Sequence, residues 1–232
     1  MQKTYLVFGA AGSIGSRIVN ELVSSGHRVI ASVRSKHEST ALNLLSDRVW
    51  IQYDDDVADR EKLDRYTLFK KLFDHIDGVI YAIGHCPPGG FPDAIKYPLS
   101  QLPLSEYRRE IDMHQVGVLN VFQRCAPKIE IGGCFVFISS AITRLRGNFP
   151  PFLQAYHHAS VIDAEDWLID GMRHDPLVVE RKIKIHRLAP AAVDTPFHQA
   201  GPRPPKLISI DTVVAEVVSA IESNEYIDKQ IL

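Results

Sequence analysis

The sequence has few cysteines, and none of them is spaced as a redox or metal motif. Its three cysteines, Cys86, Cys125 and Cys134, form no CxxC pair and are odd in number. A chain of 232 residues is also large enough to fold without disulfides. We therefore expect a reducing, cytoplasmic setting.

Long apolar runs and an excess of basic charge are absent too. No uninterrupted apolar run approaches the roughly 18 residues that a bilayer requires, and Tyr5 to Phe8 is too short for the core of a signal peptide. The 26 Lys and Arg residues against 28 Asp and Glu give a formal net charge of -2. The ten histidines lack metal-ligand spacing. We expect no membrane, nucleic-acid or metal partner.

What is present is an alternation of short apolar runs and segments of helical length. The clearest helix is Ser13 to Ser25, which Gly26 ends. The expected strands are His27 to Val33, Val49 to Tyr53, Gly78 to Ile83, Cys134 to Ser139, Lys184 to Leu188 and, first in the chain, Tyr5 to Phe8. This order predicts an α/β fold, a doubly wound (Rossmann), mostly parallel sheet with helices on both faces. No repeat or break in composition divides it, so we expect a single domain over residues 1–232.

Two proline-rich stretches, His85 to Pro103 and Ala189 to Pro205, follow predicted strands. In an open α/β sheet, ligands bind beyond the carboxyl ends of the strands. We therefore expect both stretches to be loops that wall a substrate site.

A glycine-rich turn joins the first strand to the first helix. Gly9, Gly12 and Gly15 are spaced as GxxGxxG, with Ser13 and Ile14 between the last two. Glycines there permit a tight turn and let a diphosphate approach the backbone at the positive end of the helix. No Lys-Ser/Thr pair follows, which argues against a P-loop, so the context predicts a dinucleotide site.

The end of the second strand bears on which dinucleotide is bound. No acidic residue stands there to accept hydrogen bonds from a ribose 2′-hydroxyl, and Arg34 occupies the place instead. Because a guanidinium can pair with a 2′-phosphate, the charge favours NADP(H) over NAD(H), with Ser32, Ser35 and Lys36 as further donors. A solvated arginine is the alternative reading.

Further motifs, in order along the chain, resemble the short-chain dehydrogenase/reductase family over nearly its whole length. They are Asp56-Val57 after the third strand, Tyr81 to Gly84, Phe137 to Ser140, Tyr156, and Pro190 to Thr195. The resemblance implies hydride transfer between a nicotinamide and a carbonyl or alcohol carbon. It also implies that Asp56 and Val57 contact the adenine, that Gly84 lines the cofactor, and that Pro190, Val193 and Thr195 contact the nicotinamide.

The same resemblance assigns catalytic roles. A serine after the fifth strand would bind the carbonyl oxygen, and the family register favours Ser140, although the sequence leaves Ser139 open. Tyr156 would donate a proton to the oxygen, where negative charge develops.

Two of the family's catalytic positions are changed. Ser160 stands four residues after Tyr156, where the family has a lysine, and His114 stands in place of an asparagine. Without the lysine charge the phenol stays protonated, which harms alcohol oxidation more than carbonyl reduction. We expect a reductase of a small-molecule carbonyl, with Ser160 binding ribose and His114 either relaying a proton or simply packed. Arg144 or Arg146 could supply a replacement cation.

The rival interpretation is a catalytically silent NADP(H)-binding module that senses redox state or binds a partner. It explains the changed positions without any chemistry. The resemblance also implies a homodimer or homotetramer assembled through the helices around Glu106 to Cys125 and Tyr156 to Met172.

Overall fold

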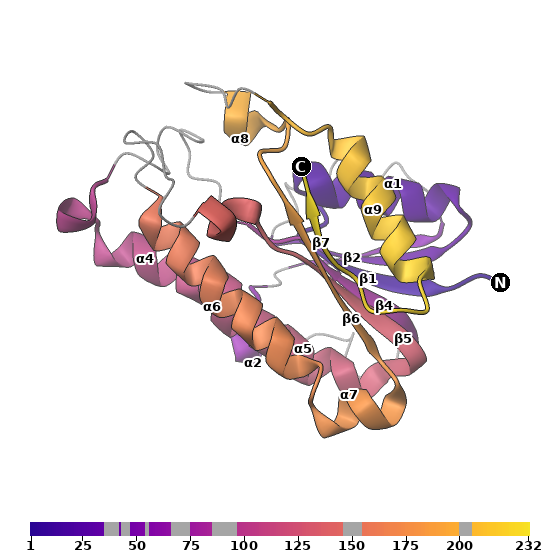
Figure 1. Cartoon of the computed structure of the whole chain (residues 1–232). Coiled ribbons are helices and arrows are strands. Elements are labelled where there is room, and N and C mark those ends of the chain that lie inside the picture. The colour runs from indigo at the N-terminus through magenta and orange to yellow at the C-terminus, as the bar shows by residue number, and fades with distance from the viewer. Residues whose placement is uncertain are drawn as a thin grey trace.

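The fold is built on one seven-stranded sheet with helices on both faces (Figure 1). It is seen in a computed structural model, which describes residues 1–34, 42, 47–53, 56–65, 75–84, 97–145, 155–199 and 206–232. The strands lie in the order β3-β2-β1-β4-β5-β6-β7, and every neighbouring pair is parallel. The prediction of a doubly wound parallel sheet is confirmed.

The strands are β1 (Thr4–Phe8), β2 (Arg28–Ser32), β3 (Val49–Gln52), β4 (Ile76–Tyr81), β5 (Ile129–Ile138), β6 (Lys184–Pro190) and β7 (Asp228–Ile231). The α-helices are α1 (Ser13–Ser24), α2 (Arg60–Arg65), α4 (Leu104–Ile111), α5 (Val118–Cys125), α6 (Tyr156–Met172), α7 (Pro176–Arg181), α8 (Pro196–Gln199) and α9 (Ile210–Glu222). Short 3₁₀ turns are η4 (Leu99–Gln101), η6 (Ala126–Lys128) and η7 (Ala141–Leu145), and η5 (Asp112–Gly117) is π-helical.

Each face of the sheet carries its own apolar core. On one face, α1 and α9 pack side by side and bury Ile18, Leu22 and Val217. On the other, α4, α5 and α6 cover a core that includes Phe135 and Ile169 (Figure 1). Because both faces are covered, the central strands are continuous apolar runs, which is why they were recognisable in the sequence.

The six predicted strands and the first helix are confirmed, with small differences at their ends. The largest is at β5, which begins at Ile129 rather than Cys134. The seventh strand, β7, was not predicted, because its residues Asp228 to Gln230 are polar and lie at the exposed edge of the sheet. The stretch Ala189 to Pro205 is not loop throughout, since α8 forms within it.

In sheets of this kind a crevice is expected where the strand order reverses, which here is beside the first strand. From β1 the chain proceeds outward through β2 and β3 and then returns to the other side of β1 as β4. Such a reversal of strand order opens a ligand site at the carboxyl ends of the two strands. The glycine turn follows β1 at this point, and Ala82 to Gly84 follow β4.

None of the helices in the described part of the chain combines the length and the hydropathy that crossing a membrane takes.

Gly117 should be intolerant of even a methyl group. An added Cβ would lie 2.6 Å from Cγ2 of Val57 and 2.8 Å from the hydroxyl of Tyr81. We expect Gly117→Ala to lower the free energy of unfolding by about 1–3 kcal/mol, because this core cannot accept the extra volume. Urea unfolding measures the change.

Gly171 provides the matched control, since no atom lies within 4 Å of the Cβ that alanine would add there. Gly171→Ala should raise the free energy of unfolding by about 0.5–1 kcal/mol, as expected for a helical glycine. Equal effects of the two substitutions would contradict the packing argument.

Candidate active site

The glycine turn is held against the end of β4. Gly9 has a positive φ of +74°, and a Cβ there would lie 2.5 Å from the carbonyl oxygen of Ala82. Gly15 lies over the turn, where a Cβ would come within 2.1 Å of the Gly9 oxygen. Both positions therefore require glycine, one for backbone conformation and close approach, the other for close approach alone.

The turn ends with α1, whose first backbone N–H groups lie at the same edge of the sheet as the carboxyl end of β1. Gly12 is the N-cap residue and donates its own N–H to the Gly9 oxygen at 3.0 Å. No side chain caps α1 and no acidic residue lies in its first turn, so Ser13 and Ile14 begin a helix whose positive end is not neutralised from within. This donor set fits the diphosphate of a dinucleotide.

The end of β2 lies next to this turn, because the N–H of Ala10 donates to the carbonyl of Ser32 at 3.2 Å. Arg34 follows as an exposed residue, and its contact with a 2′-phosphate stays a prediction. Ser32 is buried, so its expected role as an additional surface donor is not supported. Ser35 and Lys36, the other donors that we considered, lie outside the described residues.

The expected adenine contacts follow β3. Asp56 is exposed, and its carboxylate accepts the N–H of Ala58 at 3.1 Å. Val57 is buried, and its carbonyl accepts a hydrogen bond from Nδ2 of Asn120 at 3.0 Å. Only Asp56 therefore presents its side chain to solvent.

The remaining expected cofactor residues lie at the carboxyl ends of β4 and β6. Gly84 is exposed beyond β4. Pro190 ends β6 and is buried, as is Val193, whose carbonyl accepts the N–H of Thr195 at 2.8 Å. Residues Pro190 to Thr195 form a tight turn on the same edge of the sheet as the glycine turn.

The two serines after β5 diverge. Ser139 is buried and its hydroxyl donates to Oδ1 of Asp166 on α6 at 2.8 Å. Ser140 is half-buried, and its Oγ accepts the N–H of Ile142 at 3.3 Å. The hydroxyl of Ser139 is therefore committed to α6, whereas Ser140 makes a local turn contact with Ile142 in the described part of the chain.

Asp166 connects Ser139 to a cluster of charges beneath α6. The burial of Asp166 raises the pKa of its carboxyl above the usual value, although Ser139 and Arg187 act to lower it. Arg187 on β6 lies 3.5 Å from Asp166 and 3.8 Å from Asp170, and its Nε donates to Asp228 at 3.1 Å. One arginine thus holds three carboxylates around the element that receives Ser139.

Tyr156 and Ser160 share the outer face of α6. Tyr156 is the first residue of the helix and is 46% exposed, and Ser160 is also exposed. Trp167, on the same side of the helix, is 73% exposed. The hydroxyl of Ser160 donates to the His157 carbonyl at 2.7 Å and lies 3.5 Å from the Tyr107 hydroxyl of α4.

His114 lies on the inner side, within the π-helical turn. It is 3% exposed, and its Nδ1 lies 3.1 Å from Oε2 of Glu165, which is fully buried. Its role as a proton relay stays a prediction, as does the alternative of a simply packed histidine. The side chain of Arg144 and all of Arg146 lie outside the described residues, so the replacement cation stays a prediction.

The structure thus brings Ser139 and His114 to the inner side of α6 and leaves Tyr156 and Ser160 on its outer side. The sequence reasoning did not identify their partners, Asp166 and Glu165. The only signal was the acidic pair itself within an otherwise partly apolar helix. Among the described residues, no three His, Cys, Asp or Glu side chains are grouped to hold a metal ion.

The sequence model of the family described as short chain dehydrogenase matches residues 3–204. The chain belongs to this family. Its members are oxidoreductases that act on small molecules. Among curated protein sequences, none matches the chain significantly.

Solved structures share the fold at low sequence identity. A short-chain dehydrogenase from Burkholderia cenocepacia J2315 in complex with NADP has a TM-score of 0.76 at 20% identity, covering 99% of this chain and 90% of that one. A blue fluorescent protein from a metagenomic library in complex with NADPH has a TM-score of 0.81 at 16% identity, covering 99% and 96%. A short-chain dehydrogenase/reductase from Serratia marcescens BCRC 10948 has a TM-score of 0.77 at 18% identity, with the same coverage.

Removing the central cation of the cluster should destabilise the protein at neutral pH. We expect Arg187→Met to lower the free energy of unfolding by about 2–4 kcal/mol at pH 7, allowing for the partial exposure of Asp228. Arg187 holds the pKa of Asp228 below its usual value even though burial acts to raise it. The pair therefore stabilises the fold above the ordinary aspartate pKa of about 3.9 and loses this effect as pH falls through the lowered value.

Urea unfolding from pH 7 down to pH 3 measures this difference, which should shrink toward the acid end. Arg17→Met is the matched control, because Arg17 forms an exposed ion pair with Asp211 at 2.6 Å. Exposed pairs contribute little, so its unfolding should hardly change. A loss for Arg187→Met that is constant with pH would contradict a charge-based role.

Proposed function

We propose that the protein is an NADP(H)-dependent oxidoreductase that reduces a carbonyl group of a small molecule. The observation that carries the proposal is the glycine turn, which offers an unneutralised helix start at the crevice between β1 and β4. We further propose that residues 1–232 form one domain, since all the strands between Thr4 and Ile231 belong to a single sheet. We place it in the cytoplasm, as a homodimer or homotetramer.

The preference for NADP(H) over NAD(H) rests on charge. Arg34 is exposed directly after β2, and a guanidinium pairs well with a 2′-phosphate. Two structurally similar proteins were solved with NADP or NADPH, which is consistent with this preference. The residues that would hold the cofactor are Gly9, Gly12, Ser13, Ile14, Gly15, Arg34, Asp56, Val57, Gly84, Pro190, Val193 and Thr195.

When bound, the reduced nicotinamide supplies a hydride to the carbonyl carbon. Ser140 is the better candidate to bind the carbonyl oxygen, because the hydroxyl of Ser139 already donates to Asp166. Tyr156 donates the proton that the oxygen needs. With Ser160 in place of a cation, nothing at that position favours the phenolate, so the site suits reduction rather than oxidation.

Presenting Tyr156 to the substrate requires the start of α6 to face the crevice. The Tyr156 side chain is 46% exposed, so neither burial nor a rigid core prevents that contact. The proposed proton transfer therefore depends on where the first turn of α6 holds Tyr156.

A second candidate function is a silent NADP(H)-binding module. It is favoured by the outward face of α6, which carries Tyr156, Ser160 and the 73% exposed Trp167. An exposed aromatic face suits contact with another protein surface better than a closed catalytic site. On this account the cofactor site is retained and the family's chemistry is lost.

Turnover separates the two candidates. For the reductase, NADPH oxidation with a panel of aldehydes and ketones should be measurable, and Tyr156→Phe should lower kcat by roughly 10²- to 10⁴-fold, because it removes the proton donor. The decrease in NADPH absorbance measures the rate. The affinity for NADPH should be nearly the same in the wild-type protein and in Tyr156→Phe.

An unchanged rate in Tyr156→Phe would refute the assignment of the proton donor. Binding of NADPH without turnover by the wild-type protein would favour the silent module instead. In that case the double substitution Ser160→Lys with His114→Asn should restore measurable activity, since it returns both changed positions to the family pattern.

A further inference from the structure

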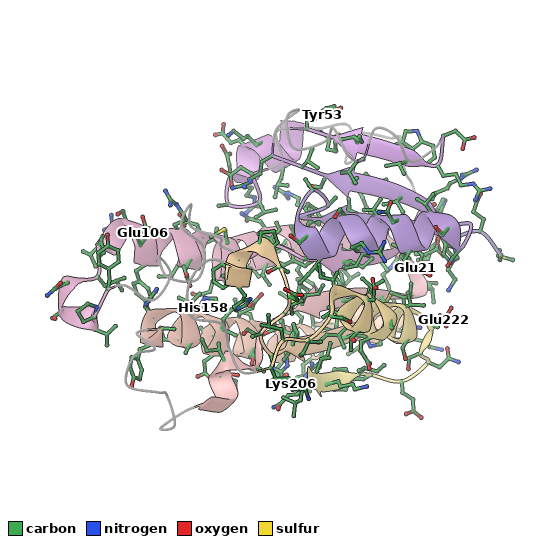
Figure 2. All side chains as sticks on the ribbon, turned by 90° about the horizontal axis from the view of Figure 1, so that it is seen from above. Glu21, Tyr53, Glu106, His158, Lys206 and Glu222 are labelled. Atoms are coloured by element: carbon green, nitrogen blue, oxygen red, sulfur yellow. The ribbon has the colours of Figure 1, made fainter. Side chains whose placement is uncertain are left out.

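Two histidine–glutamate pairs join α6 to the helical segment before it. His158 in the first turn of α6 lies 2.6 Å from Glu110 on α4, measured from Nδ1 to Oε2. His114 in the π-helical turn η5 lies 3.1 Å from Glu165, further along α6. The two imidazole rings are themselves in edge contact, with centroids 5.6 Å apart. Figure 2 shows His158 on α6 beside the neighbouring helix that carries Glu106.

The pairs are buried to different degrees. The side chains of His114 and Glu165 are 4% and 1% exposed, while those of His158 and Glu110 are 27% and 6% exposed. His158 is therefore the member of the two pairs that is most accessible to solvent. The inner pair is only partly satisfied among the described residues, since Nε2 of His114 and Oε1 of Glu165 have no hydrogen-bond partner there.

A buried cluster of charged side chains costs more stability than apolar side chains packed in the same space. Removing one partner of a buried ion pair leaves an uncompensated charge, and a partly satisfied polar network is less stable than an apolar core. The sequence could have filled the same space with apolar side chains, as it does at the neighbouring Ile162 and Ile169. Groups that cost stability in this way are concentrated at sites with a role.

The charges around His114 come from every element packed on it. Burial acts to lower its pKa, but Glu165 and Glu110 outweigh that effect, so the pKa of His114 lies above its ordinary value. The hydroxyl of Tyr81 on β4 faces the same cluster and donates to the carbonyl of Met113. His157 and His158 of α6 add their influence on Glu110, whose pKa is lowered by His158 although burial acts to raise it.

We propose that these two pairs are positioning residues that hold the first turn of α6, and with it Tyr156, and that they do so while His114 carries a proton. The proposal rests on the proposed reductase function, in which Tyr156 donates the proton. His158 is two residues from Tyr156, and the contact between Ser160 and Tyr107 lies in the same region. On this account His114 acts through the position of α6 and does not touch the substrate.

The pH range of the effect follows from the raised pKa. A histidine whose pKa is higher in the folded state stabilises the fold fully below its unfolded value of about 6.5. That stabilisation is lost as pH rises through the folded value. The lowered pKa of Glu110 works at the other end, since its contribution is present above the ordinary glutamate value and is lost on acidification. The pairs should hold best at mildly acidic pH.

The glycine turn that would hold the diphosphate opens a helix on the opposite face of the sheet from these pairs. The glycine turn leads into α1, which packs with α9, whereas His114, Glu110 and Glu165 belong to the helices of the other face. Loosening the pairs should therefore change kcat and leave the KM for NADPH nearly unchanged. A residue that merely supports the whole fold would not separate the two constants in this way.

The first arm of the test measures thermal unfolding between pH 5.5 and 9 and needs no activity. The melting temperature of the wild-type protein should fall above pH 6.5 by about 3–5 °C for each unit by which the pKa of His114 is raised. Glu165→Gln should remove most of this decline, because the neutral amide no longer favours the protonated imidazole.

His186→Gln is the matched control for a buried histidine. Burial lowers the pKa of His186 to about 4, so it stays neutral across the whole range, and its Nδ1 accepts the N–H of Ile227 at 3.2 Å. The decline of the melting temperature above pH 6.5 should be the same in this variant as in the wild-type protein. The proposal is wrong if the melting temperature of Glu165→Gln still shows the full decline above pH 6.5. If Glu165→Gln fails to fold, the same full decline in His114→Gln would refute the proposal.

The second arm measures NADPH-dependent reduction over the same pH range. In the wild-type protein kcat should fall as His114 loses its proton, and in Glu165→Gln it should be about 10- to 100-fold lower and independent of pH there. The KM for NADPH should stay within about twofold. A parallel change in kcat and KM would overturn the positioning role.

The two arms distinguish the failure of this proposal from that of the proposed function. Suppose that the wild-type protein reduces no carbonyl but the first arm gives the expected result. The proposed reductase function is then wrong, and the proton-dependent contact exists without a catalytic role. This outcome refutes the positioning role of the two pairs. If turnover is present and the first arm shows no decline, only the pairs are wrongly interpreted.

Discussion

The close packing of the glycine turn on the end of β4 is the constraint on which the rest of the structure depends. At Gly9 the backbone approaches Ala82 so closely that no Cβ fits, and Gly15 lets α1 close over the same turn. These two contacts fix the direction in which α1 leaves the sheet, and hence where its positive end lies. The side of the sheet that α1 covers follows from this arrangement.

The helix α6 divides its chemistry between two faces. Its inner face joins Ser139 through Asp166 and His114 through Glu165, whereas its outer face carries Tyr156 and Ser160. The two positions that we expect to differ from the family pattern, His114 and Ser160, are therefore not simply vacated. One is filled by a histidine with a buried acidic partner, and the other by a serine that bonds to its own helix. A reductase that needs only a protonated phenol is compatible with both replacements.

How much could be predicted from the sequence depended on whether a pattern was local. The central strands were predictable because both of their faces are buried, and the glycine turn because Gly9, Gly12 and Gly15 act within one turn. The edge strand β7 escaped prediction, since its polar residues resemble a loop. The acidic partners Glu165 and Asp166 could not be assigned either, because the direction of each side chain depends on how α6 packs, and that depends on contacts distant in the sequence.

The most direct measurement of the central claim is a titration with NADPH and, in parallel, with NADH, followed by isothermal calorimetry at fixed ionic strength. The account predicts saturable binding of NADPH, weaker binding of NADH, and near-equal binding of the two nucleotides after Arg34→Ala, because the substitution removes the contact to the 2′-phosphate. No heat of binding with either nucleotide, in a protein that unfolds cooperatively, would contradict it.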